Sequence, residues 1–188
     1  MQYLILAFAY LIGSFPTAYI AGQLLLGNDI RNLGDGNMGA QNVARVISLK
    51  AGIPVFVIDA AKGAVPVLIA RAHGADLPLV MLTGAFAMIG HNWPIFIGFR
   101  GGRGEATSFG ILMALAPRPI IITGTIALII IYKTQKVILG SAFLYILLFP
   151  LYRLMHVPGS IAAYTLGLAL LVAVTHFLRV RNATLPVR

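Results

Sequence analysis

The sequence predicts an all-α membrane protein, a polytopic bundle of seven transmembrane helices that forms one domain over residues 1–188. Composition is the first reason: 59% of the residues are hydrophobic and 10% are charged, against about 25% charged in soluble domains. Length is the second reason, because several windows of about 20 mostly apolar residues can each cross a hydrocarbon layer about 30 Å thick. Together these observations exclude a single soluble core.

Seven apolar segments are expected to cross the membrane. The first has no basic residue ahead of it and is too long for the hydrophobic core of a signal peptide, so we expect it to be retained. The fourth and fifth are short and flank Pro117-Arg118-Pro119, so they are either two abbreviated spans or one kinked span. In chain order, the segments are 3–26, 51–70, 77–96, 106–116, 120–132, 137–152 and 160–178.

Positive charge decides between six and seven spans, because Lys and Arg concentrate in the cytoplasmic loops of membrane proteins. Seven spans leave only Arg71, Arg118 and Arg153 on the outer side. Six spans divide the loop cations evenly and place Arg118 near the bilayer centre, at a cost of about 3 kcal/mol. We therefore predict seven spans, with the amino terminus outside and the carboxyl terminus in the cytoplasm. The cytoplasmic cations are then Arg31, Arg45, Lys50, Arg100, Arg103, Lys133, Lys136, Arg179, Arg181 and Arg188.

The formal net charge is +9, from 14 Lys and Arg against 5 Asp and Glu. In a chain this apolar, membrane orientation and an anionic ligand explain the excess better than nucleic acid does. The chain has no cysteine, which excludes disulfides, thiolate metal sites and a thiol nucleophile. Because His73, His156 and His176 are dispersed without metal-ligand spacing, they are expected to be boundary residues, and no metal or other cofactor is expected.

The first polar constellation follows the first span and reads RNLGDGNMGAQNVAR over 31–45. Its glycines match a dinucleotide-binding fingerprint only literally, because no strand precedes them. They still allow backbone N–H groups to face one oxyanion, and the start of the helix expected at 40–45 adds its positive end. The side chains of Asn37, Asn42 and Arg45 can donate hydrogen bonds to a phosphate, whereas the carboxylate of Asp35 would repel it. A flexible turn between two helices is the alternative interpretation. The candidate residues are Gly34, Asp35, Gly36, Asn37, Gly39, Asn42 and Arg45.

The second constellation lies inside the second span, where Asp59 and Lys62 are three residues apart. This spacing puts both side chains on one helix face, where they can pair. Counted from Ala51, Lys62 lies about 16 Å along the helix, close to the middle of the bilayer. An ionisable side chain at that depth is a functional candidate. Two interpretations stay open: an ion pair that holds the bundle in register, or a lysine that lines a water-filled cleft.

The third constellation reads GHNWPIFIGFRGGRGEAT over 90–107 and joins the third and fourth segments. Arg103 is surrounded by Gly101, Gly102 and Gly104, which predicts a second flexible turn with a central cation. His91 titrates near neutrality and is a candidate base or hydrogen-bond donor. An isolated interfacial histidine is the alternative. Its position beside two cationic glycine loops, both cytoplasmic in the seven-span arrangement, favours a role in chemistry.

Four segments resemble the acyl-phosphate:glycerol-3-phosphate acyltransferase family of bacterial inner membranes, in order and in spacing. The resemblance extends to Thr107, and beyond it the chain matches only as apolar spans. It implies a seven-helix, metal-free enzyme that carries out the first step of phospholipid synthesis with its active site facing the cytoplasm. The implied reaction transfers a fatty acyl group from acyl phosphate to the first hydroxyl of glycerol 3-phosphate, giving lysophosphatidic acid and phosphate. The segments are AYLIGSFPT (9–17), RNLGDGNMGAQNVAR (31–45), DAAKG (59–63) and GHNWPIFIGFRGGRGEAT (90–107).

Four positions depart from the family pattern. Asp35 stands in place of a serine, Gln41 in place of a threonine, Arg103 in place of a lysine and Glu105 in place of a valine. Arginine keeps the charge of lysine but replaces a compact ammonium with a planar fork. The two added carboxylates lie where phosphates are expected. Three outcomes are therefore open: an ion pair with Arg100 or Arg103, a changed substrate, or loss of activity.

The residues and the resemblance together define the expected site. The loop 34–42 would cradle acyl phosphate, Arg45 and Arg103 would hold glycerol 3-phosphate, and His91 or the substrate's own phosphate would take the proton. The catalytic candidates are Asn37, His91 and Arg103. The substrate-binding candidates are Gly34, Asp35, Gly36, Gly39, Asn42, Arg45, Lys62, Gly101, Gly102, Gly104 and Thr107.

The expected partners are acyl phosphate, glycerol 3-phosphate and membrane lipid, with the chain acting as a monomer. The alternative is a non-catalytic or divergent membrane protein that binds or transports an anion or a lipid phosphate. A transporter would more often show an inverted repeat, and none is visible in the sequence. Turnover of the two substrates is the observation that separates these two classes.

Overall fold

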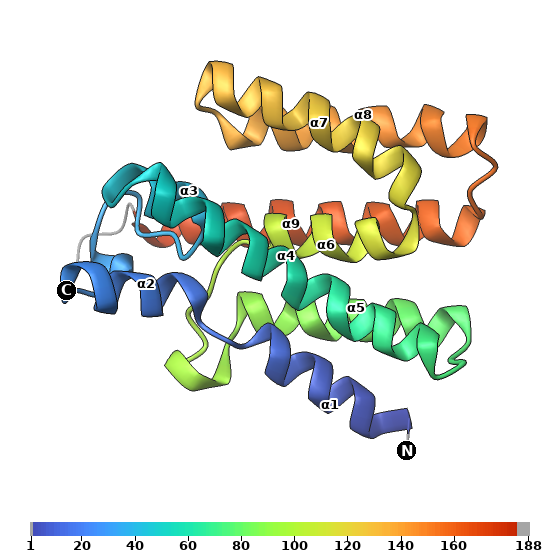
Figure 1. Cartoon of the computed structure of the whole chain (residues 1–188), viewed down its shortest axis with the longest axis horizontal. Helices are drawn as coiled ribbons and strands as arrows, with labels where there is room; N and C mark the ends of the chain where they lie inside the picture. The colour runs from blue at the N-terminus through green and yellow to red at the C-terminus, as the bar shows by residue number, and fades with distance from the viewer. Residues whose placement is uncertain (1, 184–188) are drawn as a thin grey trace.

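The computed structural model describes the backbone of residues 2–183 and the side chains of residues 3–179 (Figure 1). Every regular element in these ranges is helical, which confirms the all-α fold class. The elements are α1 (Gln2–Gly13), α2 (Thr17–Leu26), η1 (Ile30–Asn32), α3 (Ala40–Val46), α4 (Leu49–Ala72), α5 (Leu77–Asn92), η2 (Ile95–Ile97), α6 (Glu105–Leu115), α7 (Pro117–Thr134), α8 (Val137–Leu154) and α9 (Gly159–Ala183).

Within the described residues, six segments are long and apolar enough to cross a membrane, which confirms a multi-pass membrane protein at this level. The helix α6 is also apolar, but its 11 residues rise only about 16 Å, roughly half of the hydrocarbon layer. The segments α6 and α7 are separate helices rather than one kinked span, and they run in opposite directions (Figure 1). The six segments are Tyr3–Leu26, Leu49–Ala72, Leu77–Ile97, Pro117–Thr134, Val137–Leu154 and Gly159–Arg179.

The first expected span, 3–26, is not one continuous helix. The helix α1 ends at Gly13 and α2 begins at Thr17, with Ser14, Phe15 and Pro16 in non-helical conformation between them. Proline has no N–H to donate and disfavours helical backbone in the residue before it, so Pro16 accounts for the break. The break leaves the Phe15 carbonyl without a helical partner, and Lys62 Nζ donates a hydrogen bond to it at 2.6 Å.

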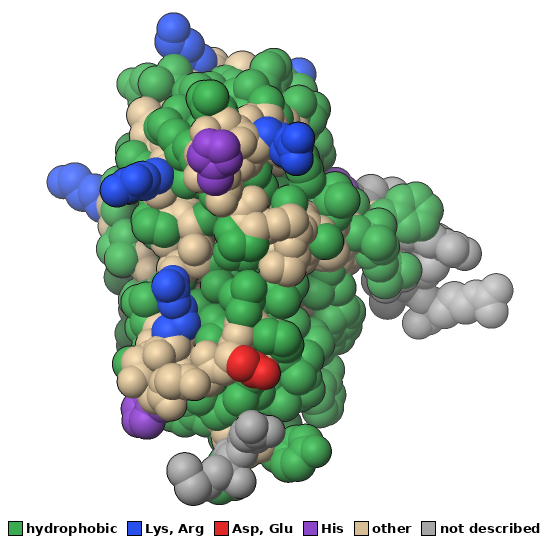
Figure 2. Space-filling model, turned by 90° about the vertical axis from the view of Figure 1, so that its right-hand side faces the viewer, with side chains coloured by type: hydrophobic (Ala, Val, Ile, Leu, Met, Phe, Trp, Pro, Cys, Tyr) green, Lys and Arg blue, Asp and Glu red, His purple; other side chains and the backbone are tan. Residues whose placement is uncertain are grey.

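The two glycine-rich segments lie at the same end of the bundle. The chain between α2 and α3, the loop 98–104 and the turn between α7 and α8 all lie toward the left of Figure 1, whereas α1 begins at the right. Figure 2 looks onto that right-hand end, where cations are scattered among hydrophobic side chains. Both glycine loops can therefore contribute to one anion-binding site.

Small residues allow α4 and α6 to cross closely in the centre of the bundle. A Cβ atom on Gly63 would strike the Thr107 carbonyl, and one on Gly110 would strike the Ala60 carbonyl. A free carbonyl at the C-terminal end of the short α6 also has a partner, because Arg71 Nη1 donates to the Ala114 carbonyl at 2.7 Å. This close crossing positions the start of α6, and with it the second glycine loop, against the inner face of the bundle.

Candidate active site

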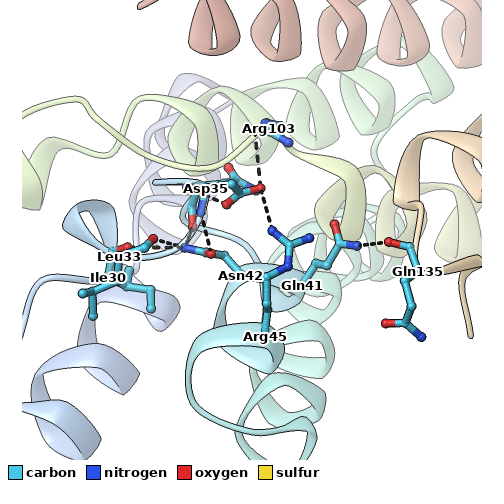
Figure 3. Close-up of polar contacts among 9 residues, drawn as sticks. Ile30, Leu33, Asp35, Gln41, Asn42, Arg45, Arg103 and Gln135 are labelled. Carbon is cyan, nitrogen blue, oxygen red and sulfur yellow. Dashed lines mark hydrogen bonds and ion pairs between the residues drawn. The ribbon is translucent and has the colours of Figure 1, made fainter. Parts of the chain in front are cut away.

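Asn42 organises the first glycine loop. It is fully buried, and its Nδ2 donates to the carbonyls of Leu33 at 2.9 Å and Asn37 at 3.1 Å, while its Oδ1 accepts from the Asp35 N–H at 3.1 Å (Figure 3). Gly34 has a φ of 62°, in the left-handed region, and a side chain there would strike Asn42 Oδ1. The amide expected to bind substrate is therefore engaged inside the loop, where it fixes the loop's shape.

Replacing Asn42 with alanine is expected to lower the free energy of unfolding by about 1–3 kcal/mol, because backbone groups of the loop lose their partners without access to water. The substitution should also weaken substrate binding, since Asp35 is no longer held. Both effects can be measured by unfolding in mixed micelles and by substrate titration. Asn28→Ala, an exposed asparagine outside the loop's hydrogen bonds, is the matched control. Equal behaviour of the two variants would contradict the assigned role.

Two guanidinium groups converge on the carboxylate of Asp35. Arg45 Nη1 lies 3.8 Å and Arg103 Nη2 lies 3.9 Å from the same oxygen, Asp35 Oδ2 (Figure 3). The two arginines come from α3 and from the second glycine loop. Both distances exceed those of hydrogen bonds, about 2.7–3.2 Å, so the N–H groups of the two forks are not consumed by Asp35. The arrangement can therefore accept an additional anion.

The second glycine loop folds back onto the end of α5. The Gly101 N–H donates to the Asn92 carbonyl at 3.2 Å, and the Gly102 N–H donates to the His91 carbonyl at 3.1 Å. A side chain at Gly101 would strike the His91 carbonyl, and Gly104 has a φ of 87°, which explains the need for glycine at both positions. This folding directs Arg103, whose buried Nε has no hydrogen-bond partner among the described residues, toward Asp35.

His91, Asp59 and Lys62 form a buried cluster beneath the second glycine loop. Lys62 Nζ lies 2.7 Å from Asp59 Oδ1, which confirms the ion pair predicted from their spacing. The same oxygen lies 3.9 Å from His91 Nδ1, while His91 Nε2 faces Gly102, where a side chain would strike it. The cluster therefore connects the broken first span, through Lys62 and Asp59, to the loop that carries Arg103.

Arg31 links η1, which precedes the first glycine loop, to η2, which precedes the second. Its guanidinium binds both carboxylate oxygens of Asp29, at 2.6–3.0 Å, and donates to the Ile97 carbonyl at 2.9 Å. The guanidinium also lies 5.4 Å from the centroid of the Tyr19 ring. Hydrogen bonds from Arg31 hold the pKa of the Asp29 carboxyl below its usual value. The pair therefore persists above the unfolded-state pKa of Asp29 and is lost only as the pH falls through the lower folded-state value.

An apolar groove of about 540 Å³ opens beside the break in the first span. Its lining includes Phe8 of α1, Phe15 at the break, Ile58 and Val65 of α4, and Phe96 of η2. These side chains are between 40% and 61% exposed, so the groove faces the outside of the bundle, where lipid lies. Lys62 also contributes to the lining. The groove can therefore hold a long apolar chain.

A family model for glycerol-3-phosphate acyltransferase matches residues 3–184. The chain belongs to the glycerol-3-phosphate acyltransferase family. The resemblance inferred from the four ordered motifs is thereby confirmed, and the match extends it through the C-terminal third of the chain.

Two relatives from the family align with 97% and 75% of this chain. Glycerol-3-phosphate acyltransferase 4 of Dehalococcoides mccartyi is 44% identical over 182 residues, which are 97% of this chain and 98% of that protein. Glycerol-3-phosphate acyltransferase 2 of Moorella thermoacetica is 45% identical over 141 residues, which are 75% of this chain and 72% of that protein.

Solved structures of the family share the fold. The crystal structure of PlsY, an integral membrane glycerol 3-phosphate acyltransferase, in its glycerol 3-phosphate form matches with a TM-score of 0.86 at 31% identity, over 96% of this chain and 90% of that chain. The lysophosphatidic acid form of PlsY matches with a TM-score of 0.82 at 30% identity, over 93% of this chain and 87% of that chain.

Thr107, an expected substrate-binding residue, is fully buried near the start of α6, and its carbonyl faces Gly63 of α4. Its hydroxyl has no hydrogen-bond partner among the described residues. A role for Thr107 in substrate binding stays a prediction.

Several residues at the site of this family member were not anticipated from the sequence. Thr175 Oγ1 donates to the Arg103 carbonyl at 3.1 Å, and Arg179 Nη2 donates to the Asn92 carbonyl at 2.8 Å. His176, expected to be a boundary residue, has a buried Nδ1 without a partner among the described residues. These three residues lie in the last span, where the sequence shows a nearly uniform apolar pattern.

The departures from the family pattern make contacts in the structure. Gln41 Nε2 donates to the Gln135 carbonyl at 2.8 Å and ties α3 to the turn between α7 and α8 (Figure 3). Glu105 Oε2 accepts from Ser141 Oγ at 2.9 Å and ties α6 to α8. Asp35 pairs with Arg103, which is one of the three outcomes expected for an added carboxylate.

Proposed function

We propose that this chain transfers a fatty acyl group from acyl phosphate to the first hydroxyl of glycerol 3-phosphate, releasing lysophosphatidic acid and phosphate. The observation that carries the proposal is the convergence of Arg45 and Arg103, from two separate glycine loops, on one anionic oxygen. Guanidinium forks match phosphate geometry, and two of them can neutralise a dianion. Membership of the glycerol-3-phosphate acyltransferase family supports the choice of acceptor.

The chemistry asks little of the protein beyond positioning. An acyl phosphate is already activated, so attack by a hydroxyl needs alignment of the reactants and neutralisation of developing charge. The loop 34–42 would cradle the acyl phosphate with its N–H groups and Asn37, while Arg45 and Arg103 would hold glycerol 3-phosphate. His91 or the phosphate of the substrate would receive the proton. No covalent acyl-enzyme is needed.

The acyl chain would lie in the apolar groove beside the broken first span. A groove that faces lipid lets a long-chain substrate enter sideways from the bilayer while its phosphate stays near the glycine loops. Lys62, which lines this groove, donates to the Phe15 carbonyl and pairs with Asp59. Its proposed role is to stabilise the break between α1 and α2, which borders the groove.

The membrane arrangement follows from charge. We propose seven crossings, with the broken α1–α2 segment as the first and the short α6 as the fourth, in a single domain over residues 1–188. The amino terminus would lie outside and the carboxyl terminus in the cytoplasm, because the end with the glycine loops carries most of the loop cations. The protein would lie in the inner membrane with its active site facing the cytoplasm. It would act as a monomer and would bind no nucleic acid.

The test is turnover by purified protein in lipid. Phosphate release from a long-chain acyl phosphate is expected only when glycerol 3-phosphate is present, with lysophosphatidic acid formed in equal amount. An acyl thioester of the same chain length serves as the control donor and should give no product. Tight binding of both ligands without turnover would support instead a non-catalytic protein that binds or transports lipid phosphates.

A further inference from the structure

The carboxylate of Asp35 is fixed by the loop that carries it. Its Oδ1 accepts from the Asn37 N–H at 3.1 Å, and its own backbone N–H donates to the buried Asn42. On either side, Gly34 and Gly36 have φ values of 62° and 67°, which set the tight path of the backbone. The carboxylate therefore keeps its place between the arginines without depending on them.

The second oxygen of this carboxylate is free to accept a hydrogen bond. Asp35 Oδ2 lies 3.8 Å and 3.9 Å from the two guanidinium groups and accepts no hydrogen bond from the described residues, although the side chain is 30% exposed. A partly exposed carboxylate oxygen that faces the site can accept a hydrogen bond from a donor on a bound ligand.

The charges of the site favour one class of ligand. A phosphate group bound to Arg45 and Arg103 would lie near a fixed negative charge, which weakens the binding of every phosphate ester. A hydroxyl on the carbon chain of the ester offsets this repulsion, because it can donate to Oδ2 while the phosphate engages the arginines. An ester without a hydroxyl has no such compensation.

We propose that Asp35 is a specificity-determining residue that selects hydroxylated phosphate esters over esters without a hydroxyl by accepting a hydrogen bond from the substrate hydroxyl at Oδ2. This inference rests on the proposed function for the identity of the acceptor. It gives a task to the carboxylate that this chain has where the family pattern has a serine.

The test compares two phosphate esters of equal chain length that differ in the hydroxyls they offer to Asp35. Glycerol 3-phosphate and n-propyl phosphate are titrated calorimetrically into wild-type protein and Asp35→Asn, without acyl donor. Wild-type protein should prefer glycerol 3-phosphate to n-propyl phosphate at least tenfold, and Asp35→Asn should reduce this preference below threefold. Asparagine keeps an oxygen for the Asn37 N–H, so the loop is retained.

Asp76→Asn is the matched control, since it makes the same charge change at the start of α5, where Asp76 Oδ1 accepts from the Leu79 N–H and asparagine caps equally well. It should leave both affinities unchanged within twofold. Tighter binding of every ligand to Asp35→Asn would mean that Asp35 merely blocks the site, and equal weakening would mean that it only supports the loop; both results overturn the inference. So would a wild-type protein without ligand preference. Absence of acyl transfer would refute the proposed function while leaving these affinities to decide the role of Asp35.

Discussion

Arg103→Ala is expected to lower the rate of phosphate release by at least a hundredfold. Loss of one preorganised donor to a developing charge typically costs that much, and Arg103 is held more tightly than its partner: its side chain is 15% exposed, against 52% for Arg45. Its carbonyl lies 3.1 Å from Thr175 Oγ1 of α9, so the loop that carries Arg103 packs against the last helix. The measurement is kcat and KM for both substrates in lipid.

Two further substitutions make this prediction specific. Arg103→Lys restores the residue of the family pattern and should recover most of the rate, because the charge is kept while the bidentate fork is lost. Arg100→Ala removes an exposed cation from the same loop and should change the rate less than threefold. If Arg100→Ala and Arg103→Ala lose activity equally, general positive charge of the loop, and not the seat of one anion, governs the reaction.

Asp59→Asn is expected to lower the free energy of unfolding by about 3–5 kcal/mol, because it leaves the ammonium of Lys62 buried without its counter-charge. Both side chains are almost completely buried, at 6% and 2% exposed, and lie 2.7 Å apart. His91 loses its nearest carboxylate at the same time. Unfolding of the purified protein by a denaturing detergent in mixed micelles, followed by circular dichroism, measures the change.

The double variant Asp59→Leu with Lys62→Met provides the control for this pair. Removing both charges avoids an unpaired ion, so the double variant should be more stable than either single substitution. If the single substitutions cost little and their effects simply add, the pair does not hold the break between α1 and α2 in shape. Lys62 would then be available to a substrate in the groove, as the second interpretation of the sequence holds.

The sequence contains most of the local information about the site. The left-handed positions Gly34, Gly36 and Gly104 are signalled by glycine itself, because other residues strain at positive φ. The pair of Asp59 and Lys62 is predictable, since a spacing of three residues in a helix fixes which side chains meet. Pro16 also indicates the break in the first span, although 3–26 was expected to be one continuous span.

Contacts between distant segments were not predictable in this way. Thr175 and Arg103 are separated by 72 positions, and Arg179 and Asn92 by 87, and no local pattern relates them. Asn42 looked like a free donor because nothing in the sequence indicates that three carbonyls of the same loop surround its amide. Thr107 follows the second loop directly in the sequence, and only the tertiary structure shows that it is fully buried beside the close crossing of α4 and α6.

By itself, the sequence determined that this protein lies in the membrane, that it is helical, and which two cationic glycine loops are the candidates for its chemistry. Composition and short-range spacing are enough for these conclusions, because hydrophobicity and backbone geometry act residue by residue or within one helical turn. The tertiary structure decided which arginines meet at one oxygen, that Asp35 stands between them, and which helices supply the surrounding contacts. Such choices depend on how whole helices pack, and packing sums many weak contacts between segments that the linear order does not relate.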